Sequence, residues 1–329
     1  MMVWQRVSFS FSMINNIQVL RAIAALNIVF YHAFGIGASY GYATQALEPL
    51  MKWAANGVDI FFVISGFVMF YVQHAHPRSP WEFFKNRIKR IVPLYWSITL
   101  GCVLLVLLVP SAFRQSEFDL QHSLLSLLFV SRFAGYQYPV LVPGWTLELE
   151  MLFYVLLAVV IAINPRHMIA SVSALLVAGV VLAGIPPLVL EFPLGMLAGW
   201  CYVNRIGAGH GRSLFIAGSG LLLASILLQA DPDVWRLLFW GIPSFLMVLG
   251  ACFIPQVNKG LWVTLGSASY GIYLIHTLTL PVFYKFVRWI GVSGHGAVDE
   301  LSLLLCVVFS ALMGVCTYRF YERPLARLF

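Results

Sequence analysis

Apolar runs of about 17 to 22 residues recur from Ile17 to the C-terminus, separated by short polar segments. A helix of this length matches the hydrocarbon core of a bilayer, because each residue adds about 1.5 Å. The pattern predicts an all-α integral membrane protein with about ten transmembrane helices. The expected spans are 17–35, 56–73, 93–110, 145–163, 168–185, 187–204, 213–229, 234–254, 261–286 and 301–320. A shorter apolar stretch, 120–131, better suits a re-entrant or interfacial helix.

The basic residues between these spans predict which ends face the cytoplasm. Five basic residues follow the second span. Three later loops also carry basic residues: Arg166, then Arg205 with Arg212, then Lys259. All four loops fall on the same side of the membrane if 120–131 does not cross it. Cytoplasmic loops carry an excess of Lys and Arg. We therefore expect a multi-pass membrane protein with both termini in the cytoplasm.

Composition agrees with a membrane protein. Hydrophobic residues make up 60% and charged residues only 10% of the chain, and a soluble domain of this size would carry far more charge. The net charge of +7 comes from short loops that set topology, so no nucleic-acid partner is expected. The five cysteines lie in apolar spans without metal-like spacing, so we expect no disulfide and no metal.

The chain reads as one membrane-embedded domain over residues 13–329, because no soluble segment of domain size is left over. Residues 1–12 are interpreted as an N-terminal tail or a start-site artefact. They contain no separate apolar core followed by a cleavage site, and Met13 would begin a natural cytoplasmic N-terminus.

Arg21 and His32 are ionisable residues inside the first span. Eleven helical positions place them on one face, about 20° apart in rotation and about 16 Å apart in height. Arg21 can snorkel to the headgroups and His32 can be a satisfied core histidine. The alternative is that they mark a functional path, since ionisable groups at such depth are costly.

Other ionisable residues collect at the level of His32. With the predicted sidedness, Asp59, Glu148, Glu150, Glu191 and His276 fall in the outer half of the membrane. Agreement in depth among several spans predicts a water-accessible chamber that opens outward. The two glutamates on one helix are about 200° apart, so both are not expected to face it.

The cytoplasmic side carries a basic, aromatic, amphipathic stretch, residues 81–96, that leads into the third span. It can anchor the protein on anionic lipid. It can also bind a polyanionic cytoplasmic ligand, because Arg87 and Arg90 occupy neighbouring positions on a helix. Arg21 opens toward the same side.

Six short motifs in this order resemble the acyltransferase 3 family of membrane acyltransferases. They cover almost the whole chain from Ile17. The matching pieces are Arg21 with His32, Gly57-Val58-Asp59 with Ser65-Gly66-Phe67, Arg87 to Tyr95, Trp145-x-Leu-x-x-Glu150-x-x-Phe-Tyr154, Ser269-Tyr270 with His276, and Glu322-x-Pro324. One departure is Met151, where relatives often have a second acidic residue; here Glu148 precedes Glu150 instead.

The resemblance implies an O-acetyltransferase with acetyl-CoA as the cytoplasmic acyl donor and an extracytoplasmic sugar hydroxyl as the acceptor. The chain length is similar to that of short members that modify bacterial exopolysaccharides and lack a C-terminal hydrolase-like domain. The expected partners are acetyl-CoA, a polysaccharide or lipid-linked oligosaccharide, and membrane lipids. A succinyl group, or a lipid, peptidoglycan sugar or small glycoside as acceptor, stays open.

Acyl transfer to a hydroxyl needs a base, a group that orients it and stabilisation of the oxyanion. We expect His32 to be the base or the carrier of a covalent acetyl group, oriented by Glu150 or, as second choice, Asp59. The expected donor-binding residues are Arg21, Arg87, Lys89 and Arg90. The expected residues of the outer chamber are Tyr154, His276 and Glu148. Glu322 is expected to be structural.

Two other classes of protein fit parts of the pattern. A transporter or flippase for a glycan or lipid-linked sugar would use buried charges along its substrate path, and it predicts flux without thioester cleavage. A structural subunit of an export complex predicts that no single polar residue matters.

Overall fold

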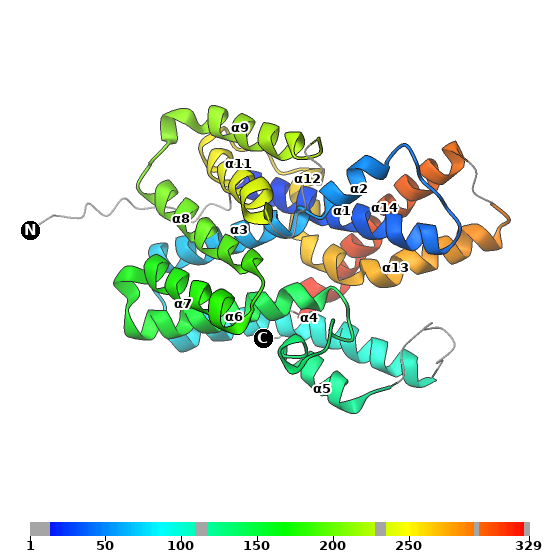
Figure 1. Ribbon diagram of the computed structural model, residues 1–329, viewed down its shortest axis with the longest axis horizontal. Coiled ribbons are helices and arrows are strands. Elements are labelled where there is room, and N and C mark those ends of the chain that lie inside the picture. Colours follow the sequence, from blue (N-terminus) through cyan, green and yellow to red (C-terminus); the bar gives the residue numbers. More distant parts are fainter. Residues whose placement is uncertain (1–13, 109–117, 228–234, 293–295, 326–329) are drawn as a thin grey trace, which may run out of the picture.

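The computed structural model describes residues 14–108, 118–227, 235–292 and 296–325, which form helices joined by short connections, with no strand among them (Figure 1). The expected tail, residues 1–12, lies outside the described residues. The α-helices are α1 (Asn15–Ser39), α2 (Glu48–Ala54), α3 (Gly57–Ala75), α4 (Pro80–Leu108), α5 (Leu120–Leu127), α6 (Gly144–Ile163), α7 (Met168–Ala183), α8 (Glu191–Val203), α9 (Gly211–Ala224), α11 (Ile242–Phe253), α12 (Leu261–Ser267), α13 (Ser269–Trp289), α14 (Ala297–Thr317) and α15 (Arg323–Leu325).

Six helical segments of the described chain are long and apolar enough to cross a bilayer, so the protein is a multi-pass membrane protein. Two further apolar helices, 187–203 and 237–253, are shorter. The prediction of an all-α membrane fold is thus confirmed, whereas the count of ten spans is not. The six segments are Asn15–Ser39, Glu48–Ala75, Pro80–Leu108, Gly144–Ile163, Pro165–Ala183 and Ala297–Leu325.

Two predicted spans differ in their boundaries from the observed helices. The span 261–286 is split into α12 and α13 at Ala268, where φ is −87° and ψ is 0°. The third span begins thirteen residues earlier than expected, because the basic stretch continues into it as the single helix α4. Continuous apolarity cannot reveal the first difference, since both helices are apolar at the break.

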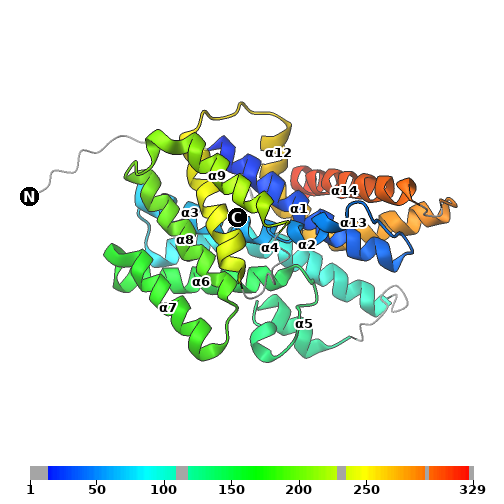
Figure 2. The ribbon, with the colours of Figure 1, turned by 45° about the horizontal axis from the view of Figure 1, so that its top comes forward.

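Close contact between α3 and α8 depends on glycine. A Cβ on Gly66 of α3 would lie 2.0 Å from the Phe192 carbonyl oxygen, and a Cβ on Gly195 of α8 would lie 2.0 Å from the Val63 carbonyl oxygen. Small residues allow helix backbones in a membrane to approach this closely. The pair fixes α3 in the centre of the molecule, where Figure 2 shows it behind α8 and beside α1.

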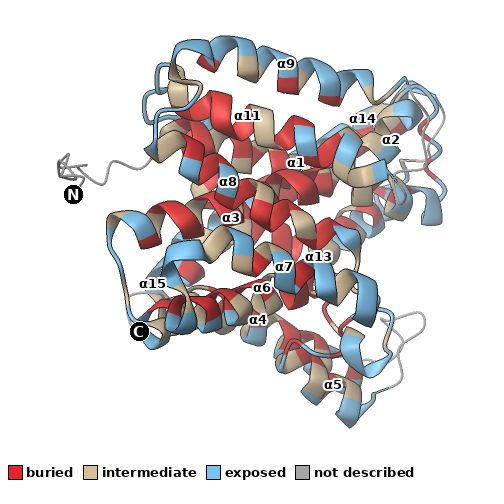
Figure 3. Cartoon of the chain, turned by 60° about the vertical axis from the view of Figure 1, so that its left-hand side comes forward, coloured by how far each residue is buried: buried red, intermediate tan, exposed pale blue. Residues whose placement is uncertain are grey.

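The helices α1, α3, α4, α6 and α13 together surround the polar interior. Buried residues lie on the faces that meet, and exposed residues lie on the outer faces (Figure 3). On α4 the outward residues are large and apolar, for example Leu104 and Leu108, as expected for a surface in contact with lipid tails. The short helix α5 packs against α4 through the bond from Trp96 Nε1 to the Leu127 carbonyl, 2.8 Å. At eight residues, α5 is too short to cross the membrane.

Candidate active site

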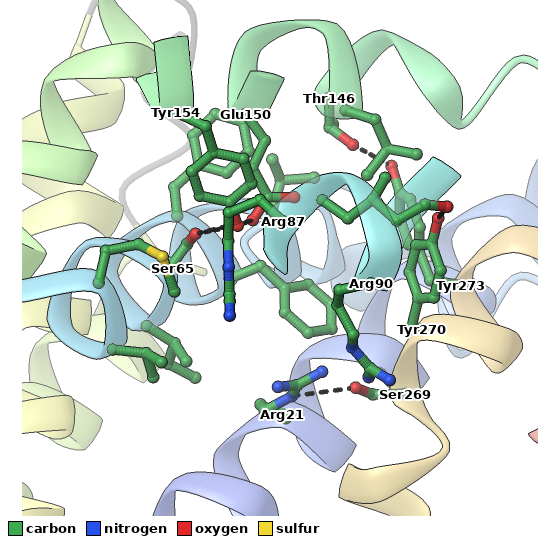
Figure 4. A pocket seen from close by; sticks show the side chains of 18 of the residues that line it. Arg21, Ser65, Arg87, Arg90, Thr146, Glu150, Tyr154, Ser269, Tyr270 and Tyr273 are labelled. Atoms are coloured by element: carbon green, nitrogen blue, oxygen red, sulfur yellow. Dashed lines mark hydrogen bonds between the residues drawn. The ribbon is translucent and has the colours of Figure 1, made fainter. Parts of the chain in front are cut away.

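An inner cavity of about 130 Å³ lies between α1, α3, α4, α6 and α13 (Figure 4). Three arginines line it, which is costly inside a membrane protein unless a ligand or partner uses their charge. Its polar lining residues are Arg21, Ser65, Arg87, Arg90, Thr146, Glu150, Tyr154, Ser269, Tyr270 and Tyr273.

Glu150 is the carboxylate of this cavity, and two hydroxyls hold it. It accepts hydrogen bonds from Ser65 Oγ at 2.7 Å and from Tyr154 OH at 2.5 Å, and the two hydroxyls are 3.2 Å apart. Tyr154 follows Glu150 by one helical turn, so both side chains leave α6 on the same face. Figure 4 shows the Arg87 side chain reaching toward this group.

The other two arginines of the inner cavity have defined partners. Arg21 Nε donates to Ser269 Oγ at 3.1 Å, which joins α1 to α13. Arg90 Nη1 lies 2.7 Å from Glu322 Oε1, and the guanidinium lies over the Tyr270 ring, 5.8 Å from its centroid. Arg87 forms no ion pair with any described residue. The expected donor-binding residues Arg21, Arg87 and Arg90 are therefore brought together, while Lys89 does not line the cavity.

An outer cavity of about 570 Å³ adjoins the inner one. The two cavities share three lining residues, Ile28, Val58 and Tyr273, which form the wall between them. The wall is fixed from one side, because Tyr273 OH donates to the Pro143 carbonyl at 2.8 Å and lies 2.6 Å from Thr146 Oγ1. Arg21 and His32, eleven residues apart on α1, thus line cavities on either side of this wall.

His32 lines the outer cavity, and its ring centroid lies 4.9 Å from that of His276. His276 Nδ1 lies 2.5 Å from the Tyr273 carbonyl oxygen. A carbonyl can only accept, so Nδ1 carries a hydrogen and Nε2 of the neutral ring is left as an acceptor. Within the described part of the chain, that buried Nε2 has no hydrogen-bond partner. The structure therefore places a histidine with a free acceptor beside His32.

The two carboxylates expected to orient His32 lie elsewhere. Glu150 and Tyr154 line the inner cavity with the arginines, not the outer chamber in which they were expected. Glu150 is six residues into α6, about 9 Å along its axis. Asp59 is bound through both oxygens by Arg236 Nε and Nη2, each at 2.8 Å.

Glu148 also differs from its expected place in the chamber. Its Oε1 accepts from the Ser131 backbone N–H at 2.9 Å and from Ser131 Oγ at 2.5 Å, and its Oε2 accepts from the Arg132 N–H at 3.1 Å. The side chain is fully buried. Glu148 therefore holds the 3₁₀ turn Arg132–Ala134, and of the two glutamates Glu150 alone lines a cavity, as their angular separation on α6 predicts.

Sequence reasoning missed several residues of the two cavities. Arg236 gave the same signal as Arg21, a lone arginine at the start of an apolar run, but it pairs with Asp59 from 177 positions away. The sequence also gave no sign that Glu322, expected to be structural, pairs with Arg90, a cavity residue on α4. Tyr273 gave no distinct signal, because one tyrosine in an apolar helix usually packs in the core.

The fold is that of a multi-pass membrane protein whose helix bundle encloses a basic cavity and an adjoining cavity that contains a histidine. The chain belongs to the acyltransferase 3 family: the family model described as an acyltransferase domain matches residues 14–319. The protein is therefore an acyltransferase, and the resemblance to this family noted from its sequence motifs is confirmed. No solved structure matches the chain.

Three curated proteins illustrate what the chain is similar to. It is 34% identical to the exopolysaccharide production protein ExoZ of Rhizobium meliloti (strain 1021), over 83% of this chain and 90% of that protein. It is 26% identical to nodulation protein 10 of Rhizobium leguminosarum bv. viciae, over 84% and 85%. It is 23% identical to the O-acetyltransferase OatA of Staphylococcus aureus (strain NCTC 8325 / PS 47), over 94% of this chain but 56% of that protein.

Proposed function

We propose that this protein is an O-acetyltransferase that moves acetyl from cytoplasmic acetyl-CoA to hydroxyl groups of an extracytoplasmic or lipid-linked glycan, an exopolysaccharide. The observation that carries this proposal is the pair of cavities that meet at Ile28, Val58 and Tyr273, one lined by three arginines and the other by His32. The similarity to ExoZ, an exopolysaccharide production protein, supports the proposed acceptor, and the similarity to OatA, an O-acetyltransferase, supports the proposed reaction.

The proposed topology has ten crossings, with both termini in the cytoplasm of a bacterium and the protein in its inner membrane. The basic loops then face inward, and the inner cavity opens to the side where acetyl-CoA is made. The shorter helices α8, α9 and α11, together with α13, supply the crossings beyond the six long ones.

The inner cavity suits the narrow end of the donor. Ligand pockets for whole cofactors are usually about 300–1,000 Å³, whereas this cavity holds about 130 Å³. We therefore assign the narrow pantetheine arm, rather than the nucleotide, to this cavity. Arg87 and Arg90 on α4 would hold the phosphates at the mouth, and Arg21 would lie along the arm. The arm would place the thioester carbonyl at the wall, within reach of the outer cavity.

The proposed reaction takes place where the cavities meet. His32 removes the proton from a sugar hydroxyl as the hydroxyl oxygen attacks the thioester carbonyl. The C–S bond breaks, the CoA thiolate leaves into the inner cavity, and the proton held by His32 returns to that sulfur. His276 replaces Glu150 as the group that orients His32, because its Nε2 can accept the second N–H of the His32 ring. Glu150, with Ser65 and Tyr154, is assigned to the donor side.

The test is to supply membranes that contain the protein with acetyl-CoA and glycan, and to measure released CoA together with acetylated glycan. His32→Ala should abolish both products, while His210→Ala, a change of an exposed histidine in the turn Ala208–His210, should preserve them. Glycan flux without CoA release would support a transporter instead. Normal acetylation by a correctly inserted His32→Ala protein would remove His32 from the mechanism.

A further inference from the structure

Two arginines and one histidine line the outer cavity, and the two arginines differ in whether their charge is compensated. Arg236 is neutralised by Asp59, with both carboxylate oxygens at 2.8 Å. His32 belongs to the proposed reaction. The guanidinium of Arg132 forms no hydrogen bond or ion pair with any residue that the structure describes, although Arg132 lines the cavity and is partly buried.

The position of Arg132 is fixed by buried bonds. Glu148 is fully buried and accepts from two consecutive backbone N–H groups, those of Ser131 and Arg132. A buried carboxylate is stable only when its oxygens are well satisfied. The same turn is closed at Gly135, whose φ of 94° favours glycine. The backbone of Arg132 is therefore held in a defined position in the cavity wall.

The surroundings of Arg132 are aromatic. Its Cζ lies 5.7 Å from the centroid of the Trp145 ring, and Tyr31 and Tyr138 line the same cavity. A cation–π contact orients the guanidinium without using its N–H donors. Aromatic faces carry partial negative charge, so they attract the positively polarised C–H groups of a sugar ring. The cavity thus combines aromatic surfaces that suit pyranose rings with the guanidinium of Arg132, whose positive charge is not compensated by a described carboxylate.

We infer that Arg132, held beside Trp145, binds the negative group of an acidic sugar residue in the acceptor glycan. The ligand is a sugar that carries a carboxylate or a phosphate next to the accepting unit, since guanidinium binds both anions bidentately. Its anion would sit at Arg132 while the neighbouring hydroxyl reaches His32. This inference rests on the proposed function and names its substrate class.

The experiment compares three trisaccharides that differ only at one sugar, which is glucuronate, glucose 6-phosphate or glucose. The protein in nanodiscs, supplied with acetyl-CoA, should show a KM for at least one acidic acceptor that is at least about tenfold lower than for the neutral one, as a charge-assisted hydrogen bond predicts. Which acidic acceptor is preferred identifies the anion. Arg132→Gln should bring the KM ratio close to one, and Arg132→Lys should preserve part of it.

Arg166→Gln is the matched control, because Arg166 lies in the separate turn Pro165–His167 and lines neither cavity. It should leave the ratio unchanged. A ratio near one in the unchanged protein, or the same ratio in Arg132→Gln, overturns the inference. If Arg132→Gln does not fold, stronger inhibition of the unchanged protein by free glucuronate or glucose 6-phosphate than by glucose supports the inference, and equal inhibition by all three overturns it. Failure of the proposed function is distinct: no trisaccharide is then acetylated.

Discussion

Arg90 and Glu322 form an ion pair of 2.7 Å, although 232 residues separate them in the chain. Arg90 is 38% exposed and lines the inner cavity, whereas Glu322 is only 4% exposed. The carboxylate lies in the π-helical turn Tyr318–Glu322 that follows α14. The helical turn that follows α14 therefore holds an arginine of the proposed donor site in place.

A double-mutant cycle measures this relationship. Arg90→Gln and Glu322→Gln should each raise the KM for acetyl-CoA, because each removes the contact that orients the other side chain. The double variant should be little worse than either single variant, with a coupling energy of about 1 kcal/mol at this partly exposed pair. Additive effects in kcat/KM for acetyl-CoA would show that Glu322 does not act through Arg90.

The two arginines of α4 should set donor affinity. Arg87→Ala combined with Arg90→Ala is expected to raise the KM for acetyl-CoA by roughly 100- to 10,000-fold, since each of the two charge-assisted bonds contributes about 1.5–3 kcal/mol. The KM for glycan should change little. Lys85→Ala is the control, because Lys85 is an exposed residue of the same helix outside the cavity lining. Unchanged donor dependence in the double variant would exclude these arginines from donor binding.

The wall between the cavities can be tested by blocking it. Val58→Phe should leave CoA binding measurable while it lowers acetyl transfer by about 100-fold, because a larger side chain at the wall keeps the thioester from the outer cavity. Binding is followed by calorimetry in nanodiscs and transfer by released CoA. Overpacking can also destabilise the fold by about 1–3 kcal/mol, so Ile28→Phe serves as a second, independent block. Full transfer in both folded variants would mean that the acetyl group takes another path.

The close packing of α3 and α8 predicts a stability effect. Gly66→Ala should destabilise the protein by about 1–3 kcal/mol, because the new Cβ would overlap the Phe192 carbonyl oxygen. Gly220→Ala on α9 is the matched control: nothing lies within 4 Å of its Cβ position, and alanine favours a helix by about 0.5–1 kcal/mol. The midpoint temperature of thermal unfolding in detergent should be lower for Gly66→Ala than for the unchanged protein. For Gly220→Ala it should be the same or higher.

Asp119 gives the short helix α5 a pH-dependent start. The Tyr136 hydroxyl donates to it at 2.8 Å and the His122 backbone N–H at 3.2 Å, and these bonds hold the pKa of the carboxyl below its usual value. The ionised carboxylate should therefore protect the His122 amide from hydrogen exchange at pH values above the usual pKa of aspartate. This protection should decline as the pH falls through the lowered pKa of Asp119. Hydrogen exchange followed by mass spectrometry should detect this decline, and Asp119→Asn should remove its pH dependence.

Sequence patterns predicted the all-α membrane fold and the meeting of three arginines in one cavity. The spacing of Arg21, Arg87 and Arg90, together with loop charge, was enough to predict that they meet, because helix periodicity and sidedness are local properties. The partners of Asp59 and Glu322 could not be predicted in this way. Depth along a span says nothing about which neighbouring helix a side chain faces, and that is decided by packing.

The position of Glu150 illustrates the same limit at the site itself. Its predicted depth in the membrane placed Glu150 near His32. In the structure, Glu150 is bonded to the Ser65 and Tyr154 hydroxyls and lines the cavity on the other side of the wall. Likewise, the break at Ala268 between α12 and α13 interrupts no apolar run. Features that depend on contacts between distant segments needed the three-dimensional structure.

The wall of Ile28, Val58 and Tyr273 has a consequence for the energy supply of the cell. A bacterial inner membrane stores energy as a proton gradient, and an open aqueous path through any abundant protein would discharge it. Here the two cavities meet at side chains, two of them apolar. With the proposed function, an acetyl group would pass from one side to the other by chemistry at this wall, without an open aqueous path for protons.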